Sequence, residues 1–113
     1  MKAVRQPQGL VLTLQSQRHV MALRHVERLL PLAALTALPM APPALLGLLD
    51  LHGRPVPVLD LQVLLGGVPT PATMRTRIAV LAAACSAAAD CPALALVLQG
   101  TGQVTRWPAD AGG

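Results

Sequence analysis

Short apolar runs separated by polar or proline-rich segments dominate the pattern of this chain. Leu10–Leu14 reads LVLTL, which is a run of strand length, and Val20–Leu23 is a second such run. The polar segment Gln15–His19 between them predicts a hairpin turn. The apolar positions within Val26–Leu30 fit either the end of a twisted strand or a helical turn.

The middle of the chain holds the most regular pattern. Leu46–Leu51 (LGLLDL) and Pro55–Leu61 (PVPVLDL) flank a short turn that contains Gly53, and this arrangement predicts a hairpin. Proline donates no backbone hydrogen bond, so the prolines of the second strand predict a sheet edge or a bulge. Leu61–Leu65 fits one helical turn. Pro42 and Pro43 exclude a central strand over Met40–Leu45, and this segment predicts an extended connection followed by one short helical turn.

The last third of the chain continues the strand pattern. Arg77–Leu81 and Ala93–Leu98 are apolar runs that predict two strands, and Ala82–Cys91 between them predicts a loose loop. Val104–Trp107 fits the start of one more strand. Eleven prolines and nine glycines argue against a helical bundle. The pattern as a whole predicts a mainly β fold.

Composition narrows the fold class further. The chain has 113 residues, of which 53% are hydrophobic and only 12% are charged, and this balance excludes disorder over most of its length. It has the size of one domain, with one core or two very small cores that share a wall. Leu10–Gln15 (LVLTLQ) and Leu94–Gln99 (LALVLQ) resemble each other, which suggests two similar β units; unrelated Leu- and Val-rich strands would look the same.

Charge and hydropathy bear on location and partners. The net charge of +4 suggests a nucleic-acid partner, but the nine Lys and Arg are scattered rather than clustered in a stripe. Leu29–Leu49 carries no charge, yet its four prolines exclude a membrane-spanning helix. The N-terminal residues lack the long apolar region of a signal peptide. We therefore expect a cytoplasmic protein with no nucleic-acid partner and no membrane insertion.

The sequence offers no convincing catalytic, cofactor or metal site. The three histidines lie neither at helical spacing nor beside the cysteines at metal-ligand spacing. Asp60 fits a cap for the helical turn that follows it. We expect no enzymatic activity. An enzyme or redox protein that uses Cys85 and Cys91 remains an alternative, as does a small basic β-barrel that binds nucleic acid.

One segment carries a family resemblance. Gly47–Leu61, GLLDLHGRPVPVLDL, resembles the signature of CheW-like domains. The matching positions are Gly47, Leu51, Gly53, Val56, Pro57, Val58, Asp60 and Leu61. The other apolar runs agree with the family in order and spacing. The resemblance covers residues 9–107, with tails at 1–8 and 108–113.

The resemblance implies a fold and a function. The fold is two packed SH3-like five-stranded β-barrels with short helical turns, and the second barrel is expected to be incomplete because relatives continue beyond Trp107. The function is that of a non-catalytic adaptor. Such proteins couple the cytoplasmic tip of a chemoreceptor to the regulatory domain of a CheA-type histidine kinase, in chemotaxis or in surface (twitching) motility. A degenerate copy that self-associates is the alternative within the family.

The resemblance also assigns partner-binding positions. They are Val26, Arg28, Leu29, His52 and Arg54. His52 stands where the family usually has an arginine, and Arg28 stands where many relatives have an acidic residue that faces the kinase. Glu27, beside Arg28, is expected to point elsewhere.

Overall fold

The computed structural model describes residues 8–81, 93–100 and 103–106. This part of the chain is mainly β, as the sequence predicts. Its strands are β1 (Gln8–Leu14), β2 (Gln17–Ala22), β3 (Val26–Pro31), β4 (Leu45–Leu51), β5 (Arg54–Asp60), β6 (Thr76–Leu81), β7 (Ala95–Gln99) and β8 (Val104–Arg106). A 3-10 turn, η1 (Leu23–His25), and one short helix, α1 (Leu61–Leu64), complete the described elements. None of the described helices is long and apolar enough to cross a membrane.

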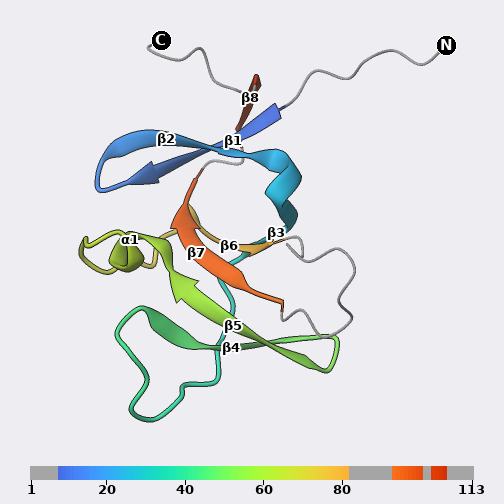
Figure 1. Cartoon of the computed structure of the whole chain (residues 1–113), viewed down its shortest axis with the longest axis vertical. Helices are drawn as coiled ribbons and strands as arrows, with labels where there is room; N and C mark the ends of the chain where they lie inside the picture. The colour runs from blue at the N-terminus through green and yellow to red at the C-terminus, as the bar shows by residue number, and fades with distance from the viewer. Residues whose placement is uncertain (1–7, 82–92, 101–102, 107–113) are drawn as a thin grey trace, which may run out of the picture.

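The strands form one connected sheet around β7. This strand pairs with β6 in antiparallel and with β5 in parallel orientation, which gives the order β3-β6-β7-β5-β4. β2, β1 and β8 form a second group, which joins β7 through the single pair Thr13–Gln99. In Figure 1, β6 and β7 lie between the β1–β2 hairpin above and the β4–β5 hairpin below.

The described pairing does not close either group into a complete ring. Thr36, downstream of β3, comes nearest to closing the first group, because its backbone exchanges two 2.9 Å hydrogen bonds with that of Leu48 in β4. The division into two closed five-stranded barrels therefore stays a prediction.

Two apolar clusters lie on the two faces of β6 and β7. One contains Ile78, Val80, Ala95 and Val97 together with Leu49, Val56 and Val58, and the other contains Ala79 and Leu98 together with Leu12 and Leu14. Because side chains alternate between the faces of a strand, each of these two strands contributes to both clusters. The chain length allows one core or two small cores that share a wall, and the described residues show the second arrangement.

The turn between β1 and β2 is shorter than the polar run predicts. Only Gln15 and Ser16 form it, both with positive φ (49° and 68°), and β2 begins at Gln17. A two-residue turn of this kind matches the twist of the strands that it joins. Arg18 and His19, expected in the turn, pair with Thr13 and Leu12 instead. Their polarity reflects an exposed strand rather than a loop.

The connection from β3 to β4 contains no helix, contrary to the expected helical turn. The described backbone here makes isolated turns, in which the Leu45 N–H donates to Pro42 O at 2.9 Å and the Ala41 N–H donates to Leu38 O at 3.4 Å. Prolines in this segment remove the donors that a helix needs. The ambiguous segment Val26–Leu30 is resolved as strand β3. The loop expected at 82–91, with both cysteines, lies outside the described residues.

Pro55 and Pro57 lie where β5 has β4 as its only strand neighbour. Their partners are Asp50 and Leu48 in β4, whereas β7 pairs only with the last three residues of β5. The expectation of an edge is thus met locally, although β5 becomes a central strand further on.

Asp60 ends β5 and caps α1, as expected. Its carboxylate is almost fully buried and accepts four hydrogen bonds, from the Gln62 N–H, the Val63 N–H, and the N–H and hydroxyl of Thr70. The single carboxylate fixes both the helix and the loop that follows it.

Candidate functional site

A cavity of about 290 Å³ opens between β3 and the β4–β5 hairpin, and we call it the hairpin pocket. Its rim is polar and consists of Glu27, Arg28, His52 and Arg54. Its floor is apolar and consists of Leu51, Val56, Val80, Leu81 and Ala93. Val56 and Val80 also belong to the first apolar cluster, so the pocket is the open end of that core.

The turn of the β4–β5 hairpin positions two of the rim residues, His52 and Arg54. His52 and Gly53 form it, with φ values of 54° and 82°. Histidine is among the residues that adopt positive φ more often than most, and glycine adopts it freely. The Gly53 N–H donates to Asp50 Oδ1 at 2.8 Å, which closes the turn. His52 and Arg54 are thereby held at the same end of the hairpin, facing β3.

A bulge in β3 positions the other two rim residues, Glu27 and Arg28. The pairing with β6 shifts between Val26, which is opposite Leu81, and Arg28, which is opposite Val80. The extra residue is Glu27. Strict alternation would put Glu27 and Arg28 on opposite faces, but a bulge places two consecutive residues against one. Both therefore line the pocket, and the expectation that Glu27 points elsewhere is wrong.

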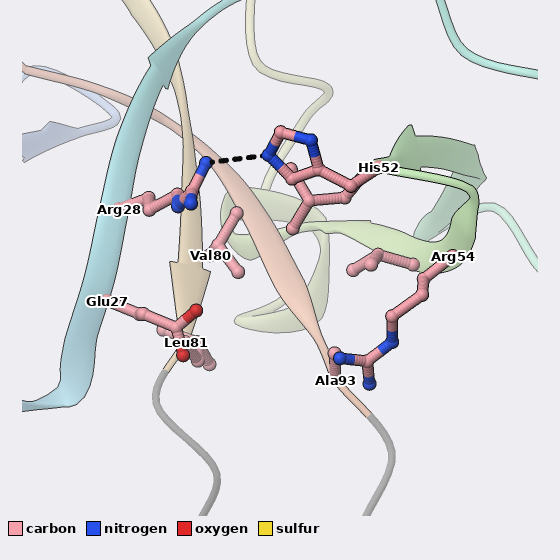
Figure 2. Close-up of a pocket in the computed structure, with 9 residues that line it drawn as sticks. Glu27, Arg28, His52, Arg54, Val80, Leu81 and Ala93 are labelled. Atoms are coloured by element: carbon pink, nitrogen blue, oxygen red, sulfur yellow. Dashed lines mark hydrogen bonds between the residues drawn. The ribbon is translucent and has the colours of Figure 1, made fainter.

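Arg28 and His52 meet across the pocket. Figure 2 shows the two side chains pointing toward each other, and Arg28 Nη1 lies 3.2 Å from His52 Nε2. A guanidinium can only donate, so Nε2 must accept. An imidazole that accepts through Nε2 has Nδ1 as its donor atom. The hydrogen bond limits where the exposed guanidinium of Arg28 can point.

The rim carries more positive than negative charge. Within the part of the chain that the structure describes, the side chain of Arg54 makes no hydrogen bond or ion pair, and the side chain of Arg28 bonds only to His52. Glu27 supplies the one carboxylate of the rim and is exposed. Figure 2 places Arg28 and Arg54 on opposite sides of the cavity, with Val80 between them. The pocket thus combines an apolar floor with two guanidinium groups that have no anionic partner among residues 8–81, 93–100 and 103–106.

The structure brings together three of the five partner-binding residues expected from the sequence. Arg28, His52 and Arg54 share the hairpin pocket. Val26 and Leu29 lie on the other face of β3, half-buried against the second apolar cluster. Their part in partner binding stays a prediction, limited to the surface that this packing leaves accessible.

The signature residues build the support of this pocket. Val56 and Val58 are buried in the first cluster, Leu51 lines the pocket, and Leu61 packs against the second cluster. Gly47 lies beside a register shift in β4, and a Cβ there would sit 2.6 Å from Thr36 O. The close approach of these backbones explains the glycine. Pro57 lies on the stretch of β5 that faces β4 alone.

Sequence reasoning missed the part of the floor that other strands contribute. Val80 and Leu81 come from β6, and Ala93 precedes β7. Their apolar character predicts burial but not which cavity they line, because that depends on strand register. No group of three or more His, Cys, Asp or Glu side chains in residues 8–81, 93–100 and 103–106 is placed to hold a metal ion.

Comparisons with known proteins place these features in context. A family model described as "CheW-like domain" matches residues 8–103. The crystal structure of the scaffolding protein TtCheW from Thermoanaerobacter tengcongensis is similar, with a TM-score of 0.78 and 17% sequence identity. The match covers 92% of this chain and 64% of that chain, so this chain spans less than two thirds of the solved protein. At this identity the likeness concerns the fold. A search of curated proteins found no match.

Proposed function

The chain belongs to the CheW-like domain family, and on that premise we propose that it is a non-catalytic adaptor that couples chemoreceptors to a CheA-type histidine kinase. The partners are the cytoplasmic tip of a receptor and the regulatory domain of the kinase. The system is chemotaxis or a related surface motility, and the site of action is the cytoplasm. The domain comprises residues 9–107, with a tail on each side.

The observation that carries the proposal is the convergence of Arg28, His52 and Arg54 on one pocket beside the signature hairpin. Three positions that the family resemblance assigns to partner binding come from β3 and from the β4–β5 hairpin, and they meet at the open end of a core. An apolar floor with charged residues around it is the usual composition of a protein-binding surface. The described residues offer no comparable gathering of a nucleophile with a base.

The proposed barrels follow the two groups of strands. The first is β3-β6-β7-β5-β4, which the contact of Thr36 with Leu48 nearly closes. The second contains β1, β2 and β8 and uses the opposite face of β6 and β7 as its remaining wall. The hairpin pocket belongs to the first barrel.

Titration calorimetry of the full chain tests the adaptor function. The ligands are the regulatory domain of a CheA-type kinase from the same cell and a soluble fragment of a receptor tip. We expect both to bind, and the double variant Cys85→Ser/Cys91→Ser to bind equally well. A chain that binds neither ligand, or that needs its cysteines, is not an adaptor of this kind. Binding to non-specific DNA with a steep salt dependence would instead favour the nucleic-acid alternative.

Self-association is a second candidate function, and the strand edges favour it. In the described residues, β2 and β8 each pair with β1 alone, which leaves each with an unpaired backbone edge. Unpaired edges promote contact between chains. Sedimentation at increasing protein concentration tests this candidate. A strictly monomeric chain whose β2 amides are well protected from hydrogen exchange would exclude it.

A further inference from the structure

The hairpin pocket has the composition of a binding site for a carboxylate on an aliphatic stem. We propose that it takes the side chain of a glutamate from the partner protein, held between Arg28 and Arg54. The inference deepens the adaptor function and, as a statement about which partner binds, rests on it.

The charges of the rim lack a counterpart within the described chain. Arg28 and Arg54 approach the cavity from β3 and β5, and neither has an anionic partner among the described residues. Paired guanidinium groups facing a common space complement a carboxylate, to which each can donate more than one hydrogen bond. Charge complementarity of this kind sets which partner fits and how it is oriented.

His52 orients Arg28 without using up its donors. A guanidinium has five N–H donors, and the bond to His52 Nε2 uses one of them. His52 is itself fixed by a turn that Asp50 closes through the Gly53 N–H. Arg28 is thus partly ordered before any partner arrives, which lowers the entropy lost on binding. We infer that His52 is a positioning residue for Arg28.

The surroundings favour a side-chain carboxylate over a free phosphate. The floor below the guanidinium groups is apolar, through Val56, Val80 and Ala93, and suits the two methylenes of a glutamate. Glu27 on the rim adds a negative charge that opposes a multivalent anion more than a monovalent one. The cavity, at about 290 Å³, is small for a ligand of nucleotide size.

Nuclear magnetic resonance of the full chain tests the site without any partner protein. The probes are N-acetyl-glutamate-N-methylamide, its neutral isostere N-acetyl-glutamine-N-methylamide, and inorganic phosphate. We expect the glutamate probe to shift the Nε–Hε signals of Arg28 and Arg54 far more than that of Arg75, and the glutamine probe to shift none of them. Equal shifts from both amides, or at all three arginines, would overturn the proposal. So would phosphate saturating the site at a lower concentration than the glutamate probe.

Calorimetry with the kinase domain or receptor fragment that binds tests the docking role. Arg28→Gln and Arg54→Gln should each weaken binding about tenfold, whereas Arg75→Gln, which removes the same charge from an exposed side chain elsewhere, should change it less than about twofold. A wild-type chain that binds, with pocket variants no weaker than Arg75→Gln, would overturn the glutamate site and leave the adaptor function intact. A wild-type chain that binds neither protein would overturn the adaptor function. It would also overturn the proposal that a glutamate of a partner protein occupies the hairpin pocket. The resonance experiment then decides only whether the pocket binds a carboxylate.

A cycle of variants identifies the partner residue. Single Glu→Gln changes on the partner are combined with Arg54→Gln on this chain. For the glutamate that enters the pocket, the double change should weaken binding no more than either single change does. Additive losses of binding free energy for every partner glutamate would contradict the proposal.

His52→Gln, which keeps an acceptor for Arg28, should retain affinity for the partner better than His52→Ala. Equal losses of affinity would contradict the positioning role of His52.

Discussion

Arg28 in β3 donates from Nη1 to Nε2 of His52, 24 residues further along the chain, across 3.2 Å. The contact joins a strand of one part of the sheet to the turn of a hairpin in another and spans the mouth of the hairpin pocket. Arginine here meets an imidazole nitrogen rather than a carboxylate. The family resemblance read from Gly47–Leu61 is confirmed by the family match over residues 8–103.

Asp60 should be the most sensitive polar position of the fold. Asp60→Ala removes the acceptor of four hydrogen bonds and leaves buried donors without partners. We expect the free energy of unfolding to fall by about 2–4 kcal/mol. Urea denaturation measures it. Asp50→Ala is the matched control, because Asp50 is exposed and, among the described residues, its carboxylate accepts one hydrogen bond, from the Gly53 N–H. A loss as large as that of Asp60→Ala would contradict the assignment.

The second strand of the hairpin should stabilise the first core. Val56 and Val58 are buried, as expected for at least two residues of this strand, whereas Leu59 is only half-buried. Val56→Ala and Val58→Ala should each lower the free energy of unfolding by on the order of 1–3 kcal/mol. Thermal and urea unfolding measure the effect. Truncation of exposed Leu65 serves as the control, and core variants that melt like it would show that this strand does not pack as described.

Two glycines of the signature should respond differently to alanine. Gly47→Ala puts a Cβ 2.6 Å from Thr36 O, so the bridge from Thr36 to Leu48 must move. Gly53→Ala meets no atom within 4 Å and has only its positive φ to oppose it, at a cost of about 1–2 kcal/mol. We expect Gly47→Ala to destabilise more and to deprotect the Leu48 amide in hydrogen exchange. The reverse order would mean that Thr36 does not approach β4 this closely.

The sequence predicts the strands well because their information is local. The runs Leu10–Leu14 and Arg77–Leu81 lie within β1 and β6, and the helical turn after Asp60 has its cap in the sequence. The exposed strand β2 is harder to predict, since Arg18 and His19 look like a loop when only their polarity is considered. The parallel pairing of β5 with β7 has no local signature at all.

The sequence predicts only part of the candidate site, because the rest depends on pairing between strands that are far apart in the chain. Resemblance to a family supplies Arg28, His52 and Arg54, but their meeting depends on the pairing of β3 with β6. The bulge at Glu27 reverses the expected direction of one side chain, and no residue type near it marks a bulge. The alternation that brings Arg28 to the pocket turns Leu29 to the second cluster. A Leu29→Asp variant would therefore disturb the core as well as any interface.

The charge at residue 28 should decide which kinase domain the chain binds. The family resemblance implies an acidic residue at this position in many relatives, and we expect a regulatory domain matched to them to offer a positive group. Arg28→Glu should therefore strengthen binding to such a standard domain, by about 1–3 kcal/mol if the new ion pair is partly desolvated. The same change should weaken binding to the chain's own partner, if that partner inserts a glutamate. Calorimetry measures the affinity of each variant for both kinase domains. Arg75→Glu is the control for the change in net charge.

His52→Arg should improve coupling to a standard partner only together with Arg28→Glu. Alone, it removes the acceptor that Arg28 now uses and sets two guanidinium groups against each other where the separation is now 3.2 Å. With Glu at position 28, the new arginine gains a carboxylate across the pocket and offers a forked set of donors to the partner. The double variant should thus bind more tightly than the sum of the single effects predicts. Strictly additive changes in affinity would show that residues 28 and 52 do not meet in the bound state.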